Sequence, residues 1–390
     1  MKRLITANIG LTRRNWLVVA GAAVTGCGGG GGAGGLVANL PGTGGTGSPV
    51  FSQGTISGFG SVIVNGIKFD DAQASVKVDG VAANSADLRL GMVASVLGAR
   101  GTDLALGTAS SVEVWSIAQG AVKEISTNAN EFSVAGVSVQ TDDNTTFEGV
   151  TGSSALTDGV LITVWGMQAG ADSDHWLATR VAVLAATSTT AIVSSGVVKV
   201  SHSLATLNGL TLTGSLAAAL TDGQLLRVQG SLSAENLLTV AGVQPIGTGS
   251  LVQSHGAVEV EGFVTSVASS TRFKMGAIEV DAGAAIYSPA GTVPALNSRL
   301  EVYGDWSGTV LKATQVLMQD QQTLKTVEIT ANIDQFTSSA NFLMRGQRCD
   351  ASNATFSQGA SSNLRQGIKV KVSGLKAGDI LKVGKLNFSV

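Results

Sequence analysis

The sequence predicts an all-β protein, built as a tandem array of about five small β-barrel modules. Three observations support this prediction. Apolar and polar residues alternate with a period of two along most of the chain. Glycine accounts for 51 of the 390 residues, well above its usual share of about 7 %. The same order of strands and glycines recurs five times, which favours successive independent modules over one large sheet.

The first 27 residues have the features of a bacterial export signal. Basic residues, including Arg13 and Arg14, precede an apolar run from Trp16 to Val24, and the segment ends at Cys27. This ending resembles the lipobox of bacterial lipoproteins, which implies that Cys27 carries a lipid and becomes the mature N-terminus. A cleaved signal with an incidental cysteine is the alternative. Arg13 and Arg14 also resemble a twin-arginine signal, although an ordinary basic export segment explains the same residues.

Residues 28–52 are rich in glycine and are predicted to form a flexible tether. By resemblance to the sorting rule of bacterial lipoproteins, an aspartate after Cys27 would favour retention in the inner membrane, and Gly28 stands there instead. We therefore expect an outer-membrane lipoprotein that faces either the periplasm or the cell surface. The net charge of −2 gives no reason to expect a nucleic-acid partner. The expected partners are the membrane, through the lipid, and an envelope protein or a glycan.

Each predicted module contains a strand, a hairpin, a variable link, an apolar strand that ends in glycine, and a final strand. In the first module, Ile56 opens a strand and Asn65-Gly66 supplies a turn that tolerates positive φ. Helical stretches are expected only near 84–90 and 215–220. The predicted module boundaries are 53–116, 119–186, 191–246 (degenerate), 256–319 and 326–390, and the strand-ending glycines are Gly98, Gly166, Gly230, Gly304 and Gly374.

Short strands in this number favour a small closed barrel, with an OB-like barrel as the first choice and an open sandwich as the second. The sequences Gly-Phe-Gly-Ser-Val at 58–62 and Val-Glu-Gly-Phe-Val at 260–264 recur within this order. With the strand-ending glycines, they resemble the bacterial domain of unknown function 5666 (DUF5666), which occurs in tandem on exported lipoproteins. The first, fourth and fifth modules match this pattern best. The resemblance implies repeated β-modules and supplies no catalytic residues.

The sequence offers little support for an enzyme. His175, His202 and His255 are scattered, and neither a metal-ligand pattern nor a cofactor motif is present. Cys349 is predicted to be a buried apolar residue, because no histidine stands at a suggestive spacing. A hydrolase remains the second alternative function, since paired catalytic carboxylates can lie far apart in a sequence.

The residue before each strand-ending glycine is predicted to point out of its barrel. These five residues are Leu97, Trp165, Gln229, Tyr303 and Ser373. The simpler interpretation is that they contact neighbouring modules. The other interpretation is a candidate binding strip, in which Trp165 and Tyr303 stack on a sugar or on another protein. Trp115, Trp176 and Trp306 are expected to pack at strand ends.

The sequence therefore predicts a non-enzymatic, lipid-anchored envelope protein whose modules present an elongated surface, acting as a scaffold or binding protein. A carbohydrate-binding or adhesive lipoprotein is the first alternative.

Overall fold

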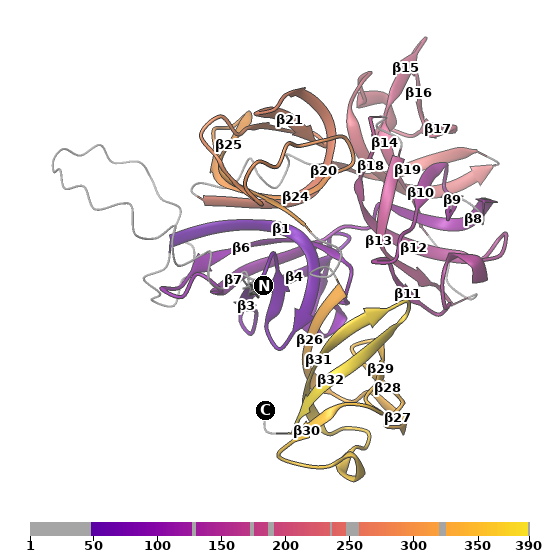
Figure 1. Ribbon diagram of the computed structural model, residues 1–390. Helices are drawn as coiled ribbons and strands as arrows, with labels where there is room; N and C mark the ends of the chain where they lie inside the picture. The colour runs from indigo at the N-terminus through magenta and orange to yellow at the C-terminus, as the bar shows by residue number, and fades with distance from the viewer. Residues whose placement is uncertain are drawn as a thin grey trace, which may run out of the picture.

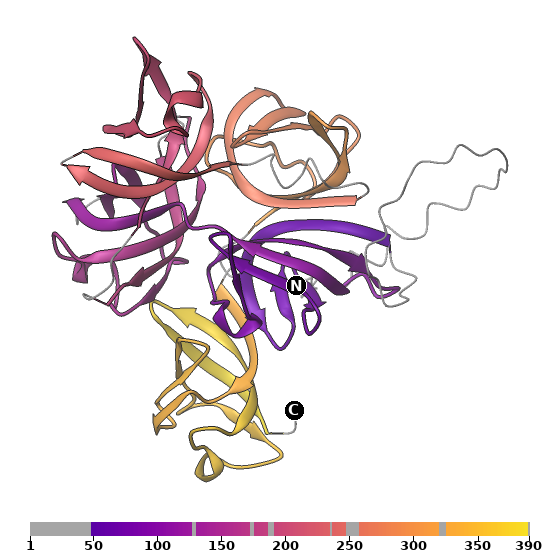
Figure 2. The ribbon, with the colours of Figure 1, turned by 180° about the vertical axis from the view of Figure 1, so that it is seen from behind.

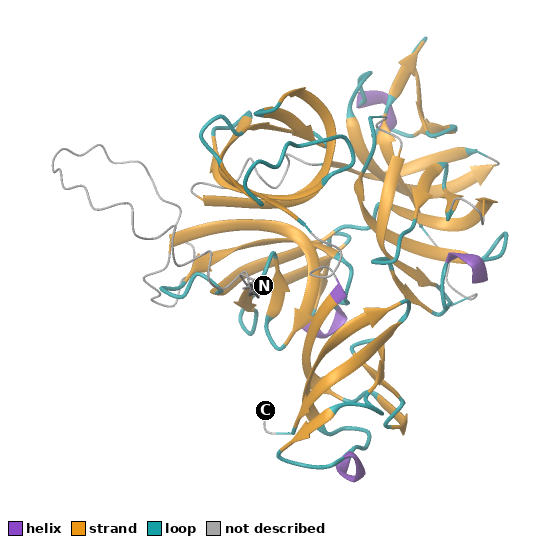
Figure 3. Cartoon of the chain, viewed as in Figure 1, coloured by secondary structure: helices purple, strands orange, loops and turns teal. Residues whose placement is uncertain are grey.

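The computed structural model describes residues 48–126, 130–171, 175–185, 191–234, 236–246, 257–319 and 325–388. The predicted signal, with Arg13, Arg14 and Cys27, and the tether as far as residue 47 lie outside these ranges. Nearly every regular element is a strand, and the helical elements are single short turns (Figure 3). The predicted helical stretches near 84–90 and 215–220 are 3₁₀ turns at Ser85–Asp87 and Ala217–Ala219. Within the described ranges, no helix is long and apolar enough to cross a membrane.

Module 1 shows how each barrel closes. Its strands are β1 (Ser48–Phe59), β2 (Val62–Val64), β3 (Ile67–Asp70), β4 (Ser75–Val78), β5 (Val81–Ala83), β6 (Val93–Arg100) and β7 (Leu106–Val114). The main strands pair in the closed order β1-β2-β3-β7-β6-β1, in which β3 and β7 are parallel and the other pairs are antiparallel. This arrangement confirms the predicted all-β fold with OB-like barrels.

The other four modules repeat this plan. Module 2 contains β8 (Ala118–Ser126), β9 (Glu131–Val134), β10 (Val137–Gln140), β11 (Thr146–Glu148), the turn Ser153–Ala155, β12 (Leu161–Gln168) and β13 (His175–Val183). Module 3 contains β14 (Ile192–Val197), β15 (Lys199–Ser201), β16 (Leu204–Leu207), β17 (Leu210–Thr213), β18 (Leu225–Ala234) and β19 (Leu237–Pro245).

Modules 4 and 5 complete the described chain. Module 4 contains β20 (Ala257–Ser269), β21 (Arg272–Met275), β22 (Ile278–Asp281), β23 (Ile286–Ser288), β24 (Arg299–Trp306) and β25 (Val310–Met318). Module 5 contains β26 (Thr326–Asn332), β27 (Gln335–Ser338), β28 (Asn341–Met344), β29 (Gln347–Asp350), β30 (Thr355–Ser357), the turn Ser361–Asn363, β31 (Lys369–Ala377) and β32 (Ile380–Asn387).

The predicted start of module 1 needs a correction. Strand β1 begins at Ser48, so residues 48–52 belong to the barrel and not to the tether. Val50 and Phe51 are buried at 3 % and 1 % exposure, because this end of β1 pairs with β6 on one side and with β20 of module 4 on the other. The sequence predicts a tether that includes Val50 and Phe51, because the residues before them are rich in glycine.

The strand-ending glycines also need a correction, because the strands continue beyond them. In every module the register shifts at this glycine, for example between Leu97 and Gly98, which is the signature of a β-bulge. A Cβ atom on Gly98 would collide with the carbonyl oxygen of Thr108 on the paired strand. The equivalent glycines meet a carbonyl in the same way, so the repeat requires glycine at the bulge.

The sequence predicted independent modules that present an elongated surface, but the modules do not form such an extended row. They cluster around module 1, with module 4 on one side, module 5 on another, and modules 2 and 3 packed together beside them (Figures 1 and 2). Strand β1 pairs in parallel with β20 and, at its far end, with β26 of module 5. Modules 1 and 5 share one continuous hydrophobic core. The long edge of β1 therefore joins three barrels, and no elongated surface of separate barrels is present in the described chain.

Candidate functional site

The five residues of the predicted strip lie at different contacts. Leu97 packs against the core of module 4, and Tyr303 lies 5.2 Å from the Arg100 guanidinium of module 1. Trp165 is only 6 % exposed and contacts the shared core of modules 1 and 5. Gln229 accepts a hydrogen bond from Arg227, and Ser373 is half-buried opposite Lys385. Leu97, Trp165 and Tyr303 therefore contact neighbouring modules, which agrees with the simpler interpretation of the strip.

Buried charged side chains join the modules. Arg100 of module 1 pairs with Glu259 of module 4 at 2.7 Å, with both side chains 7 % exposed. Arg299 pairs with Glu261 at 3.0 Å within module 4, and Glu261 also accepts a hydrogen bond from the backbone N–H of Thr55 in module 1. Charges buried this deeply require partners. The contacts between barrels are therefore specific.

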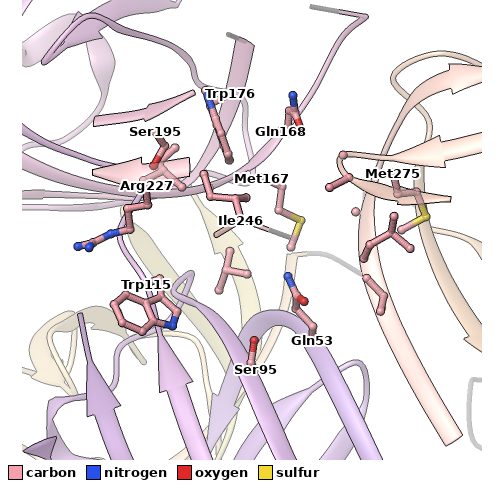
Figure 4. A pocket seen from close by; sticks show the side chains of 18 of the residues that line it. Gln53, Ser95, Trp115, Met167, Gln168, Trp176, Ser195, Arg227, Ile246 and Met275 are labelled. Carbon is pink, nitrogen blue, oxygen red and sulfur yellow. The ribbon is translucent and has the colours of Figure 1, made fainter. Parts of the chain in front are cut away.

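A cavity of about 140 Å³ opens where modules 1, 2, 3 and 4 meet, and we call it the junction cleft (Figure 4). Indole rings from modules 1 and 2 and neutral polar side chains from modules 1, 2 and 3 line it, together with apolar side chains from all four modules. Trp115 comes from the end of module 1, and Trp176 comes from β13 of module 2. The neutral polar residues of its wall are Gln53, Ser95, Ser116, Gln168, Ser195 and Gln244.

Three buried polar atoms of this wall have no hydrogen-bond partner among the described residues. They are the indole nitrogens of Trp115 and Trp176 and the hydroxyl of Ser195. A buried donor without a partner costs about 1–3 kcal/mol, so such atoms mark a place where a ligand or water completes the structure. In Figure 4 the indole nitrogen of Trp115 lies on the side of its ring toward Gln53 and Ser95.

Arg227 of module 3 fixes one wall of the junction cleft. Its guanidinium lies 5.2 Å from the centre of the Trp115 ring, donates to the Ser116 carbonyl at 2.7 Å and pairs with Asp79 at 2.8 Å. Burial lowers the pKa of Arg227, and the charge of Asp79 opposes this effect. The arginine therefore holds Trp115 in place through contacts with module 1, and its charge is already paired.

The titratable residues singled out in the sequence lie elsewhere. His175 begins β13 and faces Glu131 at 3.4 Å, His202 lies in a turn beside Ser201, and His255 lies outside the described residues. Cys349 is 1 % exposed, and burial raises the pKa of its thiol, as expected for a packed apolar residue. Within the described ranges, no group of three or more His, Cys, Asp or Glu residues is placed to hold a metal ion.

Sequence reasoning missed the junction cleft. It treated Trp115 and Trp176 as strand-end packing, and it had no means of bringing them to one cavity. The available signal was the position of Trp115 immediately before the link to module 2, where a large amphipathic ring must lie near another module.

Comparison with known proteins supports the predicted resemblance. Residues 119–182, which form most of module 2, match the family model "Domain of unknown function (DUF5666)". The match falls on the second module, and not on one of the three that we expected to match best. No curated protein matches the chain. A solved structure described as "drosophila Unr CSD456" aligns over 53 % of this chain and 98 % of its own, with 11 % sequence identity and a TM-score of 0.14.

Proposed function

We propose that this chain is a non-enzymatic, lipid-anchored binding protein of the bacterial cell envelope. The clustered barrels act as a scaffold, and the junction cleft binds a small neutral ligand of the carbohydrate class. Aromatic rings beside amide and hydroxyl groups suit the mixed apolar and polar faces of a sugar. The observation that carries the proposal is the unpartnered indole N–H of Trp115, which lies on the side of its ring toward Gln53 and Ser95 in a wall that combines apolar, glutamine and serine side chains.

The neutral lining favours a sugar over a charged ligand. The two charged side chains of the wall, Arg227 and Glu261, are already paired with Asp79 and Arg299. A neutral ligand gains hydrogen bonds from the unpartnered donors without disturbing these ion pairs. The size of the cavity suits one sugar residue of a chain whose remainder extends into solvent.

Calorimetric titration of the purified protein with glucose, galactose, N-acetylglucosamine and cellobiose tests the ligand class. Trp115→Phe removes the indole N–H and keeps an aromatic ring, so we expect affinity for the bound sugar to fall about two- to tenfold. Trp306→Phe is the matched control, because its indole nitrogen is also buried and unpartnered among the described residues but does not line the junction cleft. Absence of binding to every sugar, or equal effects of the two variants, would contradict the carbohydrate proposal.

The lipid anchor and the location require separate experiments. Mass spectrometry of the mature N-terminal peptide should find acyl chains on Cys27, and Cys27→Ser should release the protein from the membrane fraction. More than one acyl chain is needed for stable anchoring. Protease treatment of intact cells then distinguishes a surface-exposed protein, which is degraded, from one that faces the periplasm.

A further inference from the structure

A second cavity, of about 210 Å³, lies where modules 1, 2, 4 and 5 meet, and we call it the Lys376 cavity. Glu261 lines both this cavity and the junction cleft, so the two share one wall. The lining of the Lys376 cavity is richer in charge and in hydroxyl groups. Its polar side chains include Lys376, Arg299, Thr55, Thr146 and Thr179.

Lys376 is a buried cation without a counter-ion among the described residues. It lies on β31 of module 5 and is 6 % exposed. Its Nζ donates to the Asn144 carbonyl and, at 2.9 Å, to Thr146 Oγ1, and both of these acceptors belong to module 2. Two neutral acceptors leave one N–H of the ammonium group without a hydrogen-bond acceptor and its charge without an ion-pair partner among the described residues.

The other buried cations near this cavity are already ion-paired. Arg299 pairs with Glu261, and Arg180 pairs with Glu148. The Asp142 carboxylate accepts hydrogen bonds from Asn144 and from the Thr145 backbone, and its charge acts on Lys376 without an ion pair between them in the described chain. A compact anion placed here would therefore meet Lys376 as the one buried cation that lacks an ion-pair partner in the described part of the chain.

Thr179 supplies a second independent observation. The residue is 4 % exposed and lines the same cavity, and its hydroxyl has no hydrogen-bond partner among the described residues. A hydroxyl that can donate, in the wall of a cavity that also contains a buried ammonium group, matches the oxygen atoms of an oxyanion.

We propose that the Lys376 cavity binds a small oxyanion of the phosphate class, with Lys376 as its counter-ion and the Thr179 hydroxyl as a hydrogen-bond donor. Because the cavity draws its walls from four modules, the bound anion stabilises the docking of module 5 against modules 1, 2 and 4. This site is separate from the junction cleft in ligand chemistry and in the residues that contact the ligand.

The ionisation of Lys376 fits this proposal. Burial lowers its pKa to about 7, Asp142 opposes this effect, and the charges of Arg299, Arg180 and Lys325 add to it. An anion in the cavity would favour the charged ammonium, so binding above neutral pH takes up a proton.

Calorimetric titration with inorganic phosphate at constant ionic strength tests the site. We expect saturable binding to the wild-type protein that weakens about tenfold between about pH 6.5 and about pH 8.5, as Lys376 loses its proton. Lys376→Met should abolish this binding, and Lys369→Met, an exposed lysine on the same strand, should retain it. Titration with glycerol 3-phosphate distinguishes the source of the anion: weaker binding than inorganic phosphate indicates a free anion, and tighter binding indicates a phosphate carried on a larger molecule.

A further variant keeps the proposal testable if Lys376→Met fails to fold. Thr179→Val preserves the volume and the lysine, and we expect it to weaken phosphate binding several-fold. Absence of saturable phosphate binding to the wild-type protein would overturn the proposal, as would equal affinities of Lys376→Met and Lys369→Met or no effect of Thr179→Val. None of these results bears on sugar binding in the junction cleft.

Discussion

The two cavities share the wall formed by Glu261 and differ in what they leave unmatched. The junction cleft leaves neutral groups without partners, namely two indole N–H groups and the Ser195 hydroxyl. The Lys376 cavity leaves a charge. An unpartnered neutral group costs about 1–3 kcal/mol, whereas a buried charge lowers its cost by losing its proton. Only the second cavity is therefore expected to respond to pH.

The difference follows from the modules that each cavity includes. Module 3 borders only the junction cleft, and residues 191–246 contain two basic and two acidic residues, which gives no net charge. Module 5 borders only the Lys376 cavity. Residues 326–390 contain eight basic and four acidic residues, which gives a net charge of +4. The barrels share one plan, so the outward side chains, and not the fold, decide what each junction can bind.

The largest effect is expected from Arg299→Met, which disturbs the wall common to both cavities. Arg299 and Glu261 are 8 % and 6 % exposed, so the variant leaves a buried carboxylate without its cation. Loss of one partner of a buried pair costs about 3–5 kcal/mol of unfolding free energy. Denaturant unfolding measures this loss. The control is Arg272→Met in the same module, where the arginine is 57 % exposed and its pairs with Asp281 and Glu279 contribute at most about 1 kcal/mol. Similar losses of unfolding free energy in the two variants would mean that the Arg299–Glu261 pair contributes no more to stability than an exposed ion pair.

A smaller effect, which separates the cavities, is the pH dependence contributed by Lys376. Its pKa is about 7 in the folded protein and about 10.5 in the unfolded chain. Between these values the unfolded chain binds more protons, so the unfolding free energy rises with pH. The loss of unfolding free energy caused by burying charged Lys376 is complete below about pH 7 and disappears as the pH approaches 10.5. The slope reaches at most about 1.4 kcal/mol per pH unit.

Unfolding of the wild type and of Lys376→Met between about pH 7 and about pH 9 measures this contribution as the difference between two slopes. The comparison with Lys376→Met removes the contributions of other groups, such as the buried thiol of Cys349, whose raised pKa acts in the opposite direction. Lys369→Met should keep the wild-type slope. Equal slopes for all three proteins would show that Lys376 carries no penalty in its cavity.

The fold was predictable because each barrel determines its own inward pattern. Ile162 and Val164 alternate toward the core of module 2, as the period of two indicates. The turn at Asn65 and Gly66, with φ of 51° and 76°, follows from local chemistry. The recurrent glycine was recognised, but its bulge was not, because the collision that requires glycine involves a carbonyl on the neighbouring strand.

The cavities were not predictable, because outward residues acquire their roles from other modules. Arg100 and Lys376 both stand two positions after the bulge glycine, yet one pairs with Glu259 and the other contacts Asn144, at sequence separations of 159 and 232 residues. A period of two shows that such residues leave their own core. It does not show which barrel covers them. Trp165 illustrates this limit: the sequence predicts that it points out of its own barrel, and the structure places it against the shared core of modules 1 and 5.

The smallest effect tests whether the Ser195 hydroxyl in the wall of the junction cleft lacks a hydrogen-bond partner in the folded protein. The test compares two adjacent serines. Both are fully buried, but Ser194 donates to the Ala135 carbonyl and accepts from Asn208, whereas Ser195 has no partner for its hydroxyl in the described chain. Ser194→Ala should lower the unfolding free energy by about 1 kcal/mol. Ser195→Ala removes an unmatched group, so it should leave stability unchanged or raise it slightly, while it weakens sugar binding. A loss of stability in Ser195→Ala equal to that in Ser194→Ala would mean that the hydroxyl is already satisfied within the folded protein, and the cleft would then retain only its indole donors for a ligand.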